Sequence, residues 1–221
     1  MPLPAPPSRL DARPVPADPA VVRVRPGRGR RPTDLVRAEI LAAAGEVLLQ
    51  EGMAAFTIDR VAAQAGASKT TIYKWWPSKG MLAFDGFFHA SKAALTFPDT
   101  GDIEVDLVAQ VRAFVHLVSQ TRAGQVLAEL IGQAQTDPDL SQAFLVHYVE
   151  PRRQLAVEAM RRAQARGQLR ADVELQVAVD QLWGACYYRL LIPALPLGED
   201  FAAALVHNLL RGLRPKSPLA R

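Results

Sequence analysis

Apolar residues recur every three or four positions along most of this chain, a spacing that predicts amphipathic helices. The stretches between prolines lack the strict alternation of a half-buried strand, and Ala and Leu predominate over β-branched residues. The sequence therefore predicts an all-α fold. The expected helices span residues 33–51, 58–65, 69–76, 79–94, 102–121, 125–135, 139–166, 172–191 and 199–211.

Polar residues and breakers set the expected helix ends. Thr33 is expected to cap the first helix and Asp172 the helix that runs to residue 191, because short oxygen-bearing side chains can accept from free N–H groups there. Pro151 lies inside the expected helix 139–166, where its ring clashes with the carbonyl of residue 147. The sequence therefore predicts a kink or an interruption at that point.

Residues 57–76 have the pattern of two short helices joined by a tight turn. Thr57 can cap the first helix, Gly66 suits a left-handed residue at its end, and Ser68 can cap the second helix. Periodicity turns Ile72 and Trp76 inward. The outer face of the second helix then carries only cations and hydrogen-bonding groups, which favours a helix-turn-helix.

This stretch resembles the DNA-binding core of the tetracycline-repressor (TetR) family of bacterial regulators. The family pattern has fixed threonine, small, glycine and aromatic positions over about 20 residues, and the resemblance extends over residues 33–88. The matching positions are Thr57, Val61, Ala62, Ala65, Gly66, Ala67, Ser68, Ile72, Tyr73 and Trp76. Trp75 departs from the pattern, because the family more often has His or Tyr there.

The resemblance implies a set of DNA-binding residues on and beside the second helix. Side chains expected in the major groove, or at the start of the helix that enters it, are Ser68, Thr70, Thr71, Tyr73 and Lys74. Side chains expected to contact phosphates are Thr57, Lys69, Tyr73 and Lys79. Base identity does not follow from these residue types, since threonine reads several base edges.

The charge distribution agrees with a polyanionic partner. The formal net charge is +4, and residues 20–80 hold ten Lys or Arg against five Asp or Glu. Residues 1–32 are rich in proline and arginine and are expected to be disordered. Arg28, Arg30 and Arg31 are expected to form an arm along DNA phosphates or in a minor groove, although the same composition also suits a solubilising tail.

The remaining chain divides into a DNA-binding domain at 33–80, a helical domain at 81–213 and a flexible tail at 214–221. The last two helices carry more apolar residues than one small domain needs, so we expect them to pair with their copies in a homodimer. Two recognition helices one DNA turn apart, ~34–36 Å, would read a palindromic operator. A monomer with a broad internal core is the alternative.

The family resemblance also implies a cavity for a small-molecule effector among the helices of the second domain. The candidate lining residues, each of which could instead be plain core, are Phe114, Leu130, Gln133, His147, Tyr148 and Trp183. A ligand that favours the wrong spacing of the recognition helices would release DNA. The expected function is a repressor of this kind, and an activator or a ligand-independent regulator stays open.

No catalytic, metal or cofactor site is expected. The four histidines fall on separate expected helices, and His147 with Glu150 offers two ligands without a third. Cys186 is the single cysteine and lies among apolar residues, which indicates a reduced thiol in the cytoplasm. No apolar run is long enough to span a membrane. The rival from another class is a helical small-molecule carrier or enzyme whose basic arm serves only solubility.

Overall fold

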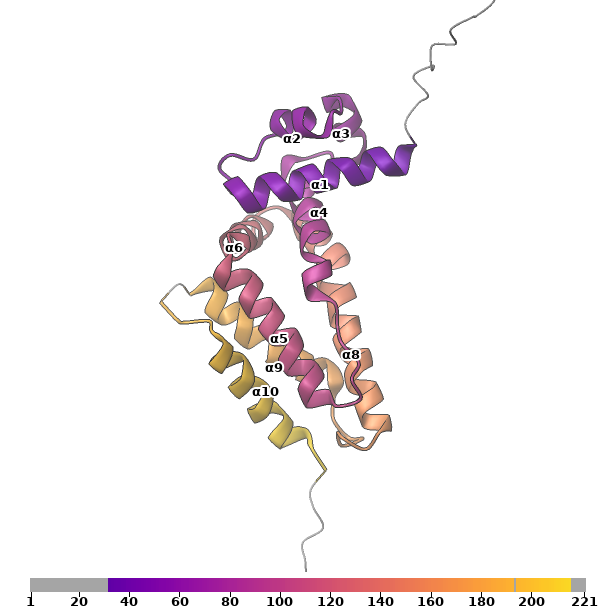
Figure 1. The fold of residues 1–221 in the computed structure, drawn as a ribbon, viewed down its shortest axis with the longest axis vertical. Coiled ribbons are helices and arrows are strands. Elements are labelled where there is room, and N and C mark those ends of the chain that lie inside the picture. Colours follow the sequence, from indigo (N-terminus) through magenta and orange to yellow (C-terminus); the bar gives the residue numbers. More distant parts are fainter. Residues whose placement is uncertain (1–31, 193, 216–221) are drawn as a thin grey trace, which may run out of the picture. The chain divides into compact units, whose positions relative to one another are not determined.

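The computed structural model of the protein describes residues 32–192 and 194–215, and all regular structure within these ranges is helical, as the apolar periodicity predicts (Figure 1). The candidate arm residues Arg28, Arg30 and Arg31 lie outside the described residues, as does most of the expected tail. The helices are α1 (Thr33–Glu51), α2 (Ile58–Ala65), α3 (Lys69–Trp75), α4 (Lys79–Ser91), α5 (Ile103–Gln120), α6 (Ala123–Ala134), α7 (Pro138–Phe144), α8 (Glu150–Ala165), α9 (Leu175–Leu191) and α10 (Glu199–Leu213).

Helix α1 supports the two helices that follow it. Its apolar stripe, which includes Ile40, Ala44 and Leu48, is buried against α2 and α4. The expected cap at Thr33 is wrong: Thr33 is already helical, so Pro32 holds the cap position and makes no side-chain bond. The first intrahelical bond then runs from Val36 N to the Pro32 carbonyl at 3.1 Å.

Helices α1 and α4 cross at unusually short range because a glycine stands on each side. A Cβ on Gly86 would lie 2.6 Å from Ala44 Cβ, and one on Gly45 would lie 2.7 Å from the Gly86 carbonyl oxygen. Any larger residue at either position would force the two backbones apart. The crossing therefore fixes the N-terminal helices directly on α4.

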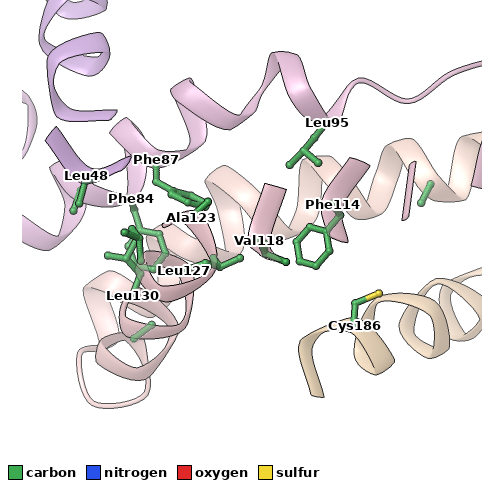
Figure 2. Packing of buried hydrophobic residues seen from close by; sticks show 14 of the residues in the cluster. Leu48, Phe84, Phe87, Leu95, Phe114, Val118, Ala123, Leu127, Leu130 and Cys186 are labelled. Carbon is green, nitrogen blue, oxygen red and sulfur yellow. The ribbon is translucent and has the colours of Figure 1, made fainter. Parts of the chain in front are cut away.

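Helix α4 connects the N-terminal helices to the rest of the molecule. Beyond its contact with α1, it packs against α6 and α7. Figure 2 shows Phe84 and Phe87 on α4 close to Leu127 and Leu130 of α6, and all four side chains are fully buried. Burying side chains of this size contributes ~1.5–3 kcal/mol each before the entropy cost.

The expected helix 139–166 is divided, as Pro151 predicts. Helix α7 runs into a five-residue π-helical segment, Leu145–Val149, and α8 begins directly after it. Pro151 thereby lies in the first turn of α8, directly after the π-helical segment. The wider π turn rotates the following side chains relative to an uninterrupted α-helix.

The last two helices lie on α5 and α8. Helix α10 runs along α5 and also contacts α9, which packs on α8 (Figure 1). The expected cap at Asp172 is wrong, because Glu174 accepts from Gln176 N at 3.1 Å and caps α9 instead. Asp172 is engaged in an ion pair with Arg170 at 3.0 Å, two residues before the cap region.

Candidate nucleic-acid interface and effector cavity

The helix-turn-helix is fixed by local hydrogen bonds that the sequence predicts. Thr57 Oγ1 accepts from Arg60 N at 3.2 Å, and Ser68 Oγ accepts from Thr71 N at 3.0 Å. Gly66 between the two helices is left-handed, with φ 59°. The turn between α2 and α3 is held at one end by Ala67 N, which donates to the Ala62 carbonyl at 3.0 Å, and at the other by the Ser68 cap.

Helix α3 has one buried face and one open face. Ile72 is fully buried and Trp76, directly after the helix, is 2% exposed, as predicted. On the other side Tyr73 is 50% exposed. The remaining candidate DNA-binding residues of this face are exposed except Thr71, which is half-buried and shares a hydrogen bond with Ser68; they are Ser68, Lys69, Thr70 and Lys74.

The lysines around α3 differ in their partners. Lys69 forms an ion pair with Asp59 of α2, and the hydrogen bond and charge of that carboxylate raise the pKa of the ammonium group. Lys74 and Lys79 are exposed and form no ion pair with any described residue. Lys79 opens α4, whose first turn is capped by Ser78. Two cations and several hydroxyls thus remain available to a polyanion on one surface.

A hydrogen-bonded cluster joins the end of α3 to the π-helical segment, and no local pattern predicts it. Its centre is Asp85 of α4, 13% exposed, whose Oδ2 accepts from Trp76 Nε1 at 2.8 Å. The other carboxylate oxygen lies 2.8 Å from His147 Nδ1. Arg37 of α1 approaches the same carboxylate at 3.7 Å and lies over the Trp76 ring. We call this set the Asp85 cluster.

An aromatic cavity of about 390 Å³ lies between α5, the π-helical segment and α9. Tyr148 and Tyr187 share a hydrogen bond in its wall, and burial raises the pKa of both phenols. Both rings are therefore neutral at physiological pH. The side chains that line the cavity are Phe114, Ile131, Phe144, Tyr148, Val149, Arg152, Arg153, Val179, Asp180, Trp183, Tyr187 and Leu191, together with Gly184.

The six candidate pocket residues are not all brought together. Phe114, Tyr148 and Trp183 line the cavity. Leu130 is fully buried between α4 and α6, Gln133 is exposed on α6, and His147 belongs to the Asp85 cluster. His147 and Tyr148 separate because adjacent residues of a helix do not face the same side.

The other residues singled out in the sequence have structural surroundings. Cys186 is fully buried, and burial raises the pKa of its thiol to about 12, so it stays protonated and unreactive. Within the described residues, no group of three or more His, Cys, Asp or Glu side chains is placed to hold a metal ion. No described helix has both the length and the apolar character needed to cross a bilayer.

Comparison with known proteins places this geometry in a family. Residues 40–84 match the model of bacterial regulatory proteins of the tetR family, and residues 97–209 match that of the tetracyclin repressor-like C-terminal domain. The crystal structure of the TetR family transcription regulator SCO0332 superposes with a TM-score of 0.77 at 58% identity, covering 81% of this chain and 99% of that one.

Two sequence relatives agree with these matches. The HTH-type transcriptional regulator YdeS of Bacillus subtilis is 33% identical over 86% of this chain and 96% of its own length. The DNA-binding transcriptional repressor TetR of Mycobacteroides abscessus is 32% identical over 78% of this chain and 90% of its own. These relatives are regulators and not enzymes, and regulators of this family bind DNA and dimerise. The chain thus belongs to the TetR family of transcriptional regulators.

Proposed function

We propose that the protein is a homodimeric repressor that binds a palindromic operator through α3 and is released by a small-molecule effector. The observation that carries this proposal is the open face of α3, which presents Thr70, Tyr73 and Lys74 on a helix whose start is capped. An exposed tyrosine between threonines and a lysine offers hydrogen bonds to base edges and charge to phosphates.

The dimer surface is proposed on α9 and α10. Val177, Tyr188 and Leu191 lie on one face of α9 at spacings of eleven and three residues, and they are 51%, 61% and 47% exposed. Large apolar side chains gathered on one helix face are typical of a protein interface. Leu205 and Leu209 of α10, half-buried in the single chain, extend the apolar surface.

Release by an effector is supported by the position of the aromatic cavity. Tyr148 lines the cavity, and its neighbour His147 is hydrogen-bonded to Asp85. Asp85 in turn accepts a hydrogen bond from Trp76, directly after α3. A ligand that displaces the π-helical segment would therefore disturb α4 and the end of the recognition helix together. A coupling free energy of ~1–3 kcal/mol between the two sites is typical of such systems.

The test is binding to DNA that flanks the protein's own gene, measured by fluorescence anisotropy with random DNA of equal length as the control. We expect specific binding that weakens steeply with salt. It should be lost when five base pairs are inserted between the two half-sites, because the insertion turns them onto opposite faces of the DNA. Equal affinity for operator and random DNA would contradict the proposal. A reporter gene read with and without the protein separates repression from activation.

A further inference from the structure

The walls of the aromatic cavity are flat rings with fixed mutual geometry. Phe114 meets Trp183 edge to face at 5.5 Å between ring centroids, and Tyr187 at 5.6 Å. Phe144 stacks on Tyr148 at 5.5 Å. Ring faces and edges arranged in this way favour a planar apolar ligand over a globular one.

The charged groups in the lining do not cancel. Arg153 and Asp180 form a two-pronged ion pair, and Arg153 also donates to Gln176. Arg152 forms no ion pair with any described carboxylate, and its guanidinium lies over the Tyr148 ring at 5.1 Å from the centroid. The cavity therefore carries the excess charge of one guanidinium, which selects for an anionic group on the ligand.

Two buried polar atoms without partners lie beside the aromatic cavity. Trp183 Nε1 is buried and has no acceptor, and Gln110 Oε1 is buried and has no donor. Both side chains line a smaller cavity of about 10 Å³, and this space shares Arg152 and Trp183 with the aromatic cavity. It has room for no more than about one water molecule. Arg152 and Trp183 thus stand between the two cavities, and Arg152 is the donor that a ligand in the aromatic cavity would meet.

We propose that the effector is a planar aromatic carboxylic acid, with its rings between Phe114, Tyr148 and Tyr187 and its carboxylate at Arg152. The acid supplies the carboxylate partner that Arg152 lacks. This assignment rests on the proposed function, because it names the chemical class of the molecule that would release DNA.

The experiment compares three probes that share one ring system and differ only in the polar group. These probes are 2-naphthoate, 2-naphthamide and 2-naphthylmethylammonium, titrated into the full-length protein by isothermal calorimetry. We expect 2-naphthoate to bind at least ~10-fold more tightly than the amide, since a hydrogen bond to a charged group is worth more than a neutral one, and the ammonium to bind weakest. Equal binding of acid and amide, or binding of none of the three, would overturn the assignment.

Two variants locate the carboxylate. Arg152→Gln should abolish the preference for the acid over the amide, whereas the matched control Arg161→Gln, an exposed arginine on the same helix, should retain it. An acid preference that survives in Arg152→Gln would place the carboxylate elsewhere and contradict the proposal.

Operator affinity in the presence of 2-naphthoate separates this assignment from the proposed function. Weaker operator binding supports both. Selective binding of the acid with unchanged operator affinity supports the ligand class and contradicts release by the ligand. Specific operator binding together with no preference for the acid contradicts the ligand class alone.

Discussion

At the scale of the residue, the lysines on the proposed DNA-binding surface are not equivalent. Lys69 must exchange the carboxylate of Asp59 for a phosphate, whereas Lys79 has no ion pair with a described residue to give up. The free energy that a lysine contributes to DNA binding is the difference between its interaction with phosphate and its interaction with the partner it leaves. A cation that is already paired therefore contributes less to DNA affinity. Exposure alone therefore overestimates the contribution of Lys69.

We expect Lys79→Ala to weaken operator and random DNA alike and to reduce the slope of log affinity against log salt by ~1, and Lys69→Ala to reduce it by less. Anisotropy titrations over a range of salt concentrations measure both. Lys92→Ala, an exposed lysine beyond the end of α4, is the control for net charge. A larger loss in Lys69→Ala than in Lys79→Ala would show that the Asp59 pair opens without cost.

At the scale of the element, the contact between α1 and α4 depends on the absence of a side chain. The sequence shows Gly45 and Gly86 only as two glycines inside expected helices, where glycine is unfavourable by ~1 kcal/mol. The structure supplies the reason, since a Cβ at Gly86 would approach Ala44 Cβ within 2.6 Å. Close helix packing offsets the poor helix propensity.

Gly86→Ala should therefore destabilise the protein by ~1–3 kcal/mol through overpacking, despite the better helix propensity of alanine. Urea unfolding followed by circular dichroism measures the change. The matched control is Gly132→Ala in α6, where an added Cβ meets nothing within 4 Å and should be neutral or stabilising. Equal effects of the two substitutions would mean that the crossing relaxes freely.

What the sequence could predict at this scale was local. The caps at Thr57 and Ser68 and the turn at Gly66 depend on neighbours within four residues, so short-range patterns sufficed. The Asp85 cluster joins Asp85 to His147, 62 positions away, which no periodicity reports. His147 and Tyr148 are adjacent on a helical segment and so point in different directions, although the sequence predicts one pocket for both.

At the scale of the whole molecule, the proposed dimer surface explains apolar residues that one chain leaves open. Tyr188 is 61% exposed and Val177 51%, although both stand on a helix otherwise packed against α8 and α10. Covering these side chains removes apolar area from water at ~25 cal/mol per Å². An isologous pairing would cover the same residues on both copies.

Tyr188→Glu should shift the protein from dimer to monomer at micromolar concentration, because each interface would then bury two unpaired carboxylates. Size-exclusion chromatography with light scattering measures the molar mass. Val105→Glu, which places the same charge on an apolar site of α5 that is 52% exposed, should leave the dimer intact. Dissociation of both variants, or of neither, would show that the dimer interface does not lie on α9.

Because the glycine crossing fixes α1 on α4, the N-terminal helices move together with α4 as one rigid body. Helix α4 has 13 residues and is thus about 20 Å long. If α4 tilts by about 6° about its C-terminal end, the N-terminal helices move by about 2 Å. In a symmetric dimer the distance between the two copies of α3 would change by up to about 4 Å, whereas the half-sites of an operator repeat every ~34–36 Å. Affinity for an operator can thus be lost through misregistry alone, with every DNA-contacting side chain still in its native conformation.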